Sequence, residues 1–268
     1  MVQSRVSTVN EIARLPRRCY CRGAMAIYEP LSAADLGATL AASGVDRWGV
    51  AGDAASLPSA PSLPTAISFL MRVRPSSIEG LLDGPTVTYF AEYVRINIAL
   101  IETGEALVRL LESRGLRAVR VDDDAPDAPG DPPVFPSKTA ATRAGLGWIG
   151  KTALLVTPEF GPAVRLGTVF TDLQLPGGRA IVDGRCGRCR ACVDACPAGA
   201  GRDVSWQAGM PRDALYDREA CDRQQKQFPQ YDEICGICIW ACPYARRTLR
   251  REHAIGDDAA RTEKGAGV

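Results

Sequence analysis

The cysteines are the residues whose type and spacing could do chemistry in this chain. There are ten, and eight of them lie between Cys186 and Cys242. The first block reads CGRCRACVDACP from Cys186 to Pro197, and a shorter block, CGICIWACP, runs from Cys235 to Pro243. Thiolates are soft ligands that bind zinc, copper and iron–sulfur clusters. Such a density of them in one segment predicts metal ligation.

The spacing C-x2-C-x2-C-x3-C-P is typical of proteins that hold two [4Fe-4S] clusters side by side. In that pattern the first three cysteines bind one cluster and the fourth binds the other, and the second block does the reverse. The first cluster is therefore expected to use Cys186, Cys189, Cys192 and Cys242. The second cluster is expected to use Cys196, Cys221, Cys235 and Cys238. Cys221 replaces the cysteine that the second block lacks.

A pair of tetrahedral zinc sites is the alternative, because each would also take four thiolates. Zinc ribbons usually carry two well-separated C-x2-C knuckles, whereas three cysteines at a spacing of three, followed by Cys-Pro, favour clusters. Cys19 and Cys21 form an isolated C-x-C pair, a weak signal for a further metal site. The single histidine, His253, falls in a polar tail. Acid–base chemistry is therefore expected from carboxylate, tyrosine or lysine groups.

A second motif, GLGWIGKT at residues 145–152, formally matches the phosphate-binding loop G-x-x-x-x-G-K-[ST]. That loop requires a strand before it and a helix after it, so that the helix N-terminus faces the phosphate. Here the helical pattern SKTAATRA comes first and a β-rich run follows. Trp148 and Ile149 are also bulky for a nest of backbone N–H groups. The order of elements argues against nucleotide binding.

The surrounding elements predict a fold of mixed helices and strands. Helical periodicity and capping signals predict helices over residues 31–43, 89–114 and 138–144. Strand patterns occur over residues 45–52, 66–73, 116–121, 153–157 and 164–171. The last two are expected to form a hairpin across the turn at 158–162. The acidic, proline-rich stretch 121–136 is too long for a simple connector and predicts a wall or lid of a site.

Composition narrows the class of protein. With 268 residues, 46% of them hydrophobic, the chain can form one large domain or two modest ones. Its 32 basic and 31 acidic residues give no strong basic field of the kind that nucleic-acid binders carry. No apolar run approaches the roughly 20 residues of a membrane span, and arginines interrupt the N-terminus where a signal peptide would be apolar. We expect a cytoplasmic monomer without a membrane partner, beginning at Met1 or Met25.

AATRAGLGWIGK at residues 140–151, taken with both cysteine blocks and with Cys221 in LYDREAC, resembles the epoxyqueuosine reductase family, cobalamin-dependent relatives of reductive dehalogenases. The resemblance covers residues 31–245. It implies an α+β chain in which a cobalamin-binding α/β sandwich domain precedes a ferredoxin-like domain with two [4Fe-4S] clusters. The expected parts are an irregular extension (1–28), the cobalamin and substrate domain (29–173), the double-cluster domain (174–250) and a polar tail (251–268).

The resemblance also implies cofactors and site residues. Electrons would pass from a small redox donor protein of ferredoxin or flavodoxin type, through the clusters, to a base-off cobalamin. Asp131 is the implied proton donor, because the family has an aspartate upstream of the AGLG motif; a solvated loop carboxylate is the alternative. Four further residues are expected near the corrin: Lys138, Trp148, Lys151 and Thr157. For Trp148 a place in the core is the alternative.

The function that follows is the reduction of an epoxide-like or otherwise activated organic substrate. Family members that act on queuosine-type tRNA often carry a further helical-repeat domain, and this chain ends soon after Cys242, so a tRNA-borne and a small organic substrate both stay open. Two other functions are alternatives: an iron–sulfur electron carrier for a partner enzyme, and a protein that reactivates another enzyme's corrinoid. The long segment before residue 174 argues against the carrier.

Overall fold

The computed structural model describes residues 31–57, 60–121, 135–231 and 234–250. Six residues named above lie outside these ranges: Met1, Cys19, Cys21, Met25, Asp131 and His253. The described residues after Pro30 form one compact unit. No helix within these ranges is long and apolar enough to cross a membrane.

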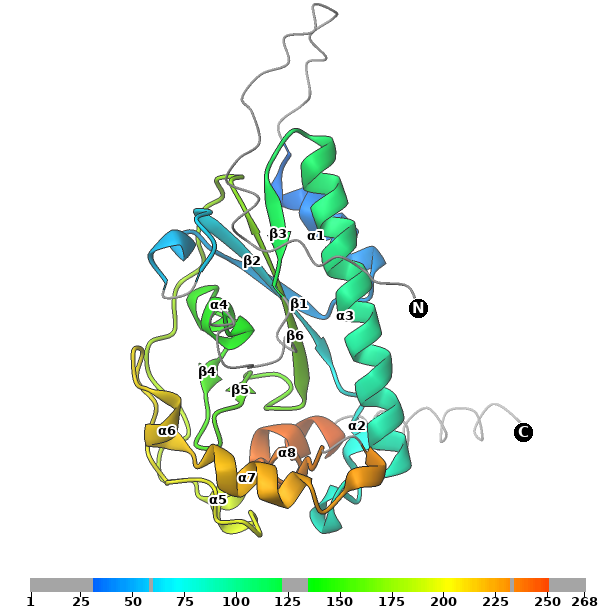
Figure 1. Ribbon diagram of the computed structural model, residues 1–268, viewed down its shortest axis with the longest axis vertical. Coiled ribbons are helices and arrows are strands. Elements are labelled where there is room, and N and C mark those ends of the chain that lie inside the picture. The colour runs from blue at the N-terminus through cyan, green and yellow to red at the C-terminus, as the bar shows by residue number, and fades with distance from the viewer. Residues whose placement is uncertain (1–30, 58–59, 122–134, 232–233, 251–268) are drawn as a thin grey trace, which may run out of the picture. The chain divides into compact units, whose positions relative to one another are not determined.

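A four-stranded antiparallel sheet forms the centre of this unit (Figure 1). Its strands run in the order β1 (Arg47–Ala51), β2 (Thr65–Arg72), β6 (Val164–Thr171) and β3 (Ala118–Arg120). β2 is buried along nearly its whole length because both faces of the sheet are covered. β3 is short and pairs only with residues 169–171 of β6. Among the described residues, the first half of β6 therefore has no neighbouring strand on that side.

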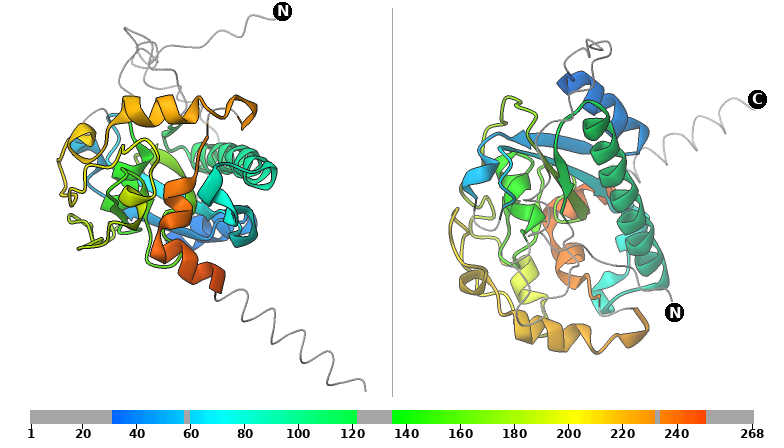
Figure 2. Two further views of the ribbon diagram at one scale, coloured as in Figure 1. Left: turned by 90° about the horizontal axis from the view of Figure 1, so that it is seen from below. Right: turned by 45° about the horizontal axis from the view of Figure 1, so that its top comes forward.

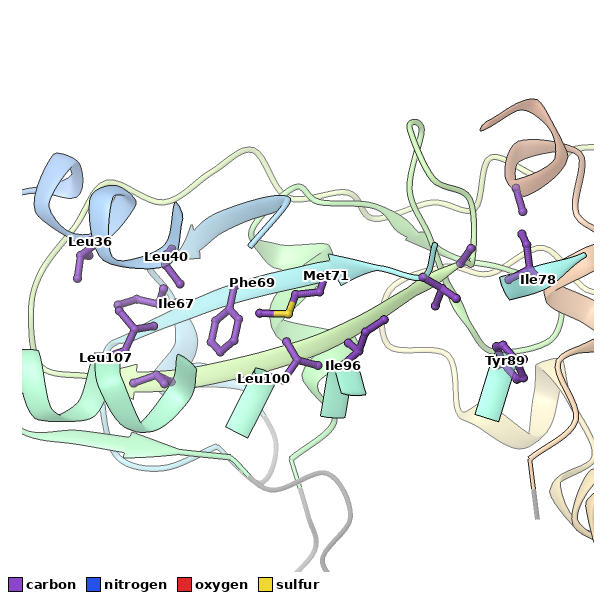
Figure 3. Close-up of a cluster of buried hydrophobic side chains, with 14 of the residues drawn as sticks. Leu36, Leu40, Ile67, Phe69, Met71, Ile78, Tyr89, Ile96, Leu100 and Leu107 are labelled. Atoms are coloured by element: carbon purple, nitrogen blue, oxygen red, sulfur yellow. The ribbon is translucent and has the colours of Figure 1, made fainter. Parts of the chain in front are cut away.

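One face of the sheet is covered by α3 (Val87–Ser113), with α1 (Ala33–Ala42) beside it. Ser32 and Asp35 form a capping box at the start of α1, as the sequence pattern predicts. Figure 3 shows the apolar side chains that α1 and α3 bury against the inward-facing residues of β2. The buried apolar residues of α3 include Tyr89, Ile96, Leu100, Leu107 and Leu111.

Glu92 interrupts this apolar stripe, and its carboxylate is completely buried. Arg74 Nη2 donates to Glu92 Oε2 at 2.6 Å, and Arg95 Nε donates to the same oxygen at 2.8 Å. Burial alone would raise the pKa of Glu92, but the hydrogen bonds from Arg95 and Arg74 lower it to about 2. The carboxylate is therefore charged in the folded protein and joins α3 to the chain just before α2 (Pro75–Ile78).

The other face of the sheet is covered by α4 (Ser137–Arg143), which is followed by a small second sheet of β4 (Trp148–Ile149) and β5 (Leu155–Val156). The predicted hairpin between residues 153–157 and 164–171 is wrong, because β5 pairs with β4 and β6 pairs with β2 and β3. The reason is local: Gly150 N–H donates to Leu154 O at 2.8 Å and closes a tight turn that returns β5 onto β4. The helix-then-strand order around the glycine-rich loop is confirmed.

The segment that carries the cysteines lies at one end of the sheet (Figures 1 and 2). Its helices are α5 (Ala191–Asp194), α6 (Arg212–Leu215), α7 (Arg218–Gln225) and α8 (Ile237–Ala241). Single 3-10 turns occupy Ala54–Ser56, Leu81–Asp83 and Pro229–Tyr231. Ile234, Ala245 and Leu249 belong to the same buried cluster as the residues of α1 and α3. The division into domains at residue 173 stays a prediction, since both segments contribute to one core.

Candidate functional site

The structure brings the four cysteines expected at the first cluster close together. Cys186 and Cys189 lie on the turn before α5, where Cys189 N–H donates to Cys186 O at 3.1 Å. Cys192 lies on α5 and Cys242 at the end of α8, and these two helices contact each other. Burial, and then the neighbouring Cys242, Cys186 and Cys189, raise the pKa of the Cys192 thiol to about 11. We call these four residues the first quartet.

The other four cysteines form a second quartet next to the first: Cys196, Cys221, Cys235 and Cys238. Burial, then proximity to Cys221 and Cys196, raises the pKa of Cys235. Burial, followed by the neighbouring Cys192 and Cys235, raises the pKa of Cys238 to about 12. α7 supplies Cys221 and α8 supplies Cys238. Each quartet thus combines side chains that are far apart in sequence.

The spread of these side chains bears on which metal group they suit. Around a single zinc ion with Zn–S distances of about 2.3 Å, tetrahedral sulfurs lie about 3.8 Å apart. In the part of the chain that the structure describes, no three Cys, His, Asp or Glu side chains converge closely enough to hold one metal ion. The four ligands of a [4Fe-4S] cluster each bind a separate iron, so they need not converge on one point. Buried thiols with raised pKa values would release their protons on binding it.

The glycine-rich loop and the hairpin lie directly against both quartets. Trp148 Nε1 donates to Cys186 Sγ at 3.4 Å. The hydroxyl of Thr152 is hydrogen-bonded to Cys192 in the first quartet and to Cys238 in the second. A Cβ added at Gly150 would lie 3.9 Å from Cys186 Sγ. The motif that resembles a phosphate loop therefore serves here as a wall of the cysteine site.

Lys151 is committed to an ion pair inside this wall. Its ammonium donates to Asp203 Oδ1 at 2.6 Å, and its side chain is only 5% exposed. The hydrogen bond from Lys151, together with the guanidinium of Arg190, lowers the pKa of Asp203. This pairing ties the loop to the cysteine segment and leaves the lysine unavailable to a phosphate.

A cavity of about 750 Å³ lies against the open edge of β6. Residues 164–167 of β6 and Asn97, Leu100 and Ile101 of α3 form one side. The start of α4 and the turn between β4 and β5 form another, and Trp206, Met210 and Leu215 of the cysteine segment close a third. The size falls within the range of small-molecule and cofactor sites. The segment that carries the two quartets therefore also forms one side of the cavity.

The lining of the cavity is partly apolar and carries positive charge. Its basic residues are Arg120, Lys138, Arg165, Arg212 and Arg218, and no carboxylate occurs among the described lining residues. Arg165 is held in place, because its Nε donates to Asn97 Oδ1 at 2.9 Å and its guanidinium lies 4.2 Å from the centre of the Tyr93 ring. Lys138 donates to Ala153 O at 2.9 Å, and Ala153 adopts a positive φ of 57°. The cavity suits a ligand with negative charge or many acceptor groups.

The four residues expected near the corrin take different places. Lys138 lines the cavity. Trp148 is buried, with the edge of its ring toward Tyr244 at a centroid distance of 5.2 Å. Lys151 pairs with Asp203, and Thr157 accepts a hydrogen bond from Phe160 N at 2.9 Å in the turn after β5. Trp148, Lys151 and Thr157 therefore do not line the cavity.

Comparison with known proteins agrees with this architecture. No protein-family model matches the chain. The epoxyqueuosine reductase of Gloeobacter violaceus is 31% identical over 173 residues, which are 58% of this chain and 49% of that protein. Over this stretch the chain is similar to epoxyqueuosine reductases. It spans half or less of the length of the curated relatives that it matches.

Solved structures related to the epoxyqueuosine reductase family share the fold. A reductive dehalogenase with B12-dependent chemistry superposes with a TM-score of 0.61 at 18% identity, over 79% of this chain and 31% of that one. An epoxyqueuosine reductase solved with an epoxyqueuosine-modified tRNA stem loop gives a TM-score of 0.52 at 19% identity, over 80% of this chain and 65% of that one.

Several residues of the candidate site carry no signal in the sequence. Arg165 and Asn97 meet at the cavity although they are 68 residues apart in the chain. Tyr216, whose hydroxyl donates to the sulfur of Cys221, follows cavity-lining Leu215 directly. Only Thr152 had a detectable signal, because it ends the glycine-rich motif.

Proposed function

We propose that this chain is a cobalamin-dependent iron–sulfur reductase. The observation that carries the proposal is the shared wall: one segment contributes both the two cysteine quartets and the side of a cofactor-sized cavity. Cofactors placed in these sites would be neighbours, as electron transfer requires. An electron carrier would need the quartets alone, so the cavity favours the reductase.

Each quartet would hold one [4Fe-4S] cluster, and the cavity would hold base-off cobalamin. Bound there, cobalamin would supply a strongly reducing cobalt centre to the substrate. Lys138 fits a contact residue, because its ammonium is fixed at the cavity by Ala153 O. Trp148 would act on the first cluster and not on the corrin, because its indole N–H donates a hydrogen bond to Cys186 Sγ. Lys151 and Thr157 would act on the corrin only by holding the loop and the turn beside it.

The open edge of β6 is suited to a ligand with many amide groups. Val121 N–H donates to Thr168 O at 2.9 Å, so the backbone polar groups of Thr168 point away from β2. Backbone direction alternates along a strand, so Leu166 and Val164 present N–H and C=O groups on the same side, where they line the cavity. These groups can donate to and accept from the amides of a corrin while apolar neighbours limit water.

For the substrate we propose an epoxide-like or otherwise activated organic molecule. One relative was solved with an epoxyqueuosine-modified tRNA stem loop, and another is a reductive dehalogenase. The basic lining of the cavity suits a substrate that carries negative charge, such as the phosphates that flank a nucleoside. Asp131 stays the predicted proton donor.

Anaerobic reconstitution followed by cobalamin titration tests the proposal. Two iron–sulfur clusters and a base-off absorption spectrum are expected. Ile101→Trp, which adds bulk at the cavity lining, should weaken cobalamin binding about tenfold or more. Ile98→Trp, one turn away on α3 and outside the lining, is the matched control and should not.

Two results would contradict the proposal: a colourless protein that holds zinc, or a cluster protein that binds no cobalamin. Turnover should then be measured with an epoxyqueuosine-containing stem loop and, separately, with a halogenated phenol. Binding of cobalamin without turnover on any substrate, but with reactivation of another corrinoid enzyme, would favour the reactivator.

A further inference from the structure

The first quartet reaches the protein surface. Cys189 is exposed, whereas the other seven cysteines of the two quartets are partly buried. The turn that carries Cys189 also presents Gly187 and Arg188 to solvent. A cluster held by this quartet would therefore have one edge close to anything that binds this surface.

We call four exposed arginines the arginine face. Arg185 and Arg188 flank Cys186 in the chain, Arg179 borders the same small pocket as Arg185, and Arg247 lies over the ring of Tyr244. The guanidinium of Arg185 lies 5.8 Å from the centre of the Trp148 ring. That of Arg247 lies 5.0 Å from the centre of the Tyr244 ring. The two rings contact each other, and Trp148 donates to Cys186 Sγ. Two of the arginines are thus linked by an aromatic pair to a ligand of the first quartet.

The arginine face differs from its surroundings in charge balance. Several other arginines of the cysteine segment have acidic partners: for example, Arg190 pairs with Asp194 and Asp203, and Arg202 pairs with Asp217. None of the four arginines forms an ion pair with a carboxylate in the described ranges. Arg179 and Arg185 border a pocket of about 430 Å³, in which Asp183 is the only acidic lining residue within those ranges.

The arginine face lies on the opposite side of β4 from the cavity. Successive side chains of a strand point to opposite faces. Ile149 lines the cavity, whereas Trp148 faces Cys186 and Tyr244. A molecule bound at the arginine face therefore approaches the first quartet without entering the substrate side.

We propose that the arginine face docks the acidic surface of a one-electron donor protein, of ferredoxin or flavodoxin type, and that electrons enter at the first quartet. In each encounter the donor is oxidised by one electron and the cluster is reduced by one, and no bond is made or broken. The inference rests on the proposed function, because it requires a cluster in that quartet. Paired charges of opposite sign steer association and fix orientation, which a brief redox contact needs.

The test compares two triple variants with equal changes in net charge. Arg185→Gln/Arg188→Gln/Arg247→Gln removes three of the four charges of the face. Arg47→Gln/Arg109→Gln/Arg117→Gln is the matched control, since these exposed arginines pair with carboxylates on the β-sheet part of the chain. Binding of oxidised plant-type ferredoxin to the reconstituted protein is measured at low and high ionic strength. Cluster reduction by the reduced ferredoxin is followed by rapid mixing.

The native protein and the control should bind ferredoxin and lose affinity as salt rises. The face variant should bind ferredoxin at least about tenfold more weakly. Its cluster should also be reduced at least about tenfold more slowly. Equal behaviour of the two variants would overturn the proposal. So would a face variant that loses affinity for a stem-loop RNA while keeping that for ferredoxin, because the arginines would then contact nucleic acid.

Iron, labile sulfide and cobalamin binding are determined on the same samples. Ferredoxin binding that depends on the face, in a protein that takes up no cobalamin, would contradict the proposed reductase and leave the docking site standing. Normal clusters and cobalamin with no dependence on the face would contradict only the docking site.

Discussion

Trp148 shows how one side chain can adjust the site without touching a substrate. Its indole N–H donates to the sulfur of Cys186, and hydrogen bonds to ligand sulfurs favour the more negative, reduced state of a cluster. The sequence suggested a residue near the corrin or in the core for this position. The structure places it in the core, beside the first quartet.

Trp148→Phe should therefore lower the reduction potential of one cluster. Loss of a hydrogen bond worth about 1 kcal/mol corresponds to a shift on the order of 40 mV for one electron. Redox titration followed by EPR measures it. Trp48→Phe, a partly buried tryptophan on β1, is the control and should leave both potentials unchanged. An unchanged potential in Trp148→Phe would show that the indole does not act on the cluster.

Glu92 is a second residue whose substitution has a measurable expected effect, in this case on the pH dependence of stability. Its pKa is depressed in the folded protein to about 2, below the ordinary value of 4.5 for glutamate. Its contribution to stability is therefore fully present above about pH 4.5 and is lost as the pH falls toward 2. Glu92→Gln should cost about 2 kcal/mol of unfolding free energy at neutral pH and flatten this acid-side dependence.

Denaturant unfolding between pH 2 and 7 checks the effect of Glu92→Gln. Glu105→Gln on the same helix is the control, because its pair with Arg109 is exposed and its change should stay within about 0.5 kcal/mol. A Glu92→Gln protein as stable as the control would mean that the two arginines contribute no net stabilisation.

At the scale of elements, a long helix could be predicted from its periodic sequence pattern, whereas the pairing of short strands could not. The 27 residues of α3 repeat an apolar stripe often enough to define a helix and its face. β4 and β5 have two residues each, so they carry no periodicity, and their pairing depends on a turn closed by backbone groups. The cysteine quartets were predictable because metal ligation imposes spacing. The cavity was not, since its lining comes from segments brought together only by the fold.

Close packing at β6 gives a prediction at this scale. A Cβ at Gly167 would overlap the ring of Phe69 on the paired strand. Gly167→Ala should therefore destabilise the fold by about 1–3 kcal/mol. Gly37→Ala within α1 has room, at 3.4 Å from Trp48, and should be neutral or stabilising by up to about 1 kcal/mol. Thermal unfolding of both variants decides; equal Tm values would show that the Phe69 ring moves aside freely.

At the scale of the molecule, the cysteine segment and the sheet are stabilised together. Gly236, between Cys235 and Cys238 of the second quartet, packs closely on Tyr89: an added Cβ would lie 3.0 Å from its ring. Tyr89 lies in the first turn of α3, whereas Leu107 and Leu111 lie near its other end. Loss of the proposed clusters should therefore loosen one end of α3 more than the other.

Hydrogen exchange before and after anaerobic chelation of iron measures this effect. Faster exchange is expected over residues 186–245 and around Tyr89, with residues 103–111 and β2 unchanged. The core shared by Ile234 and Ala245 with α3 is the physical reason. Uniform acceleration across the sheet would instead indicate that cluster binding and global folding are one transition.

The two side chains of the short strand β4 bear on the order in which an electron donor and a substrate can bind. Ile149 faces the cavity and Trp148 faces the first quartet, so a donor and a substrate would approach opposite sides of the same peptide. Neither must leave before the other arrives. Oxidised donor should then compete with reduced donor but not with the substrate in product-inhibition measurements, and successive single electrons can be delivered while one substrate molecule stays bound.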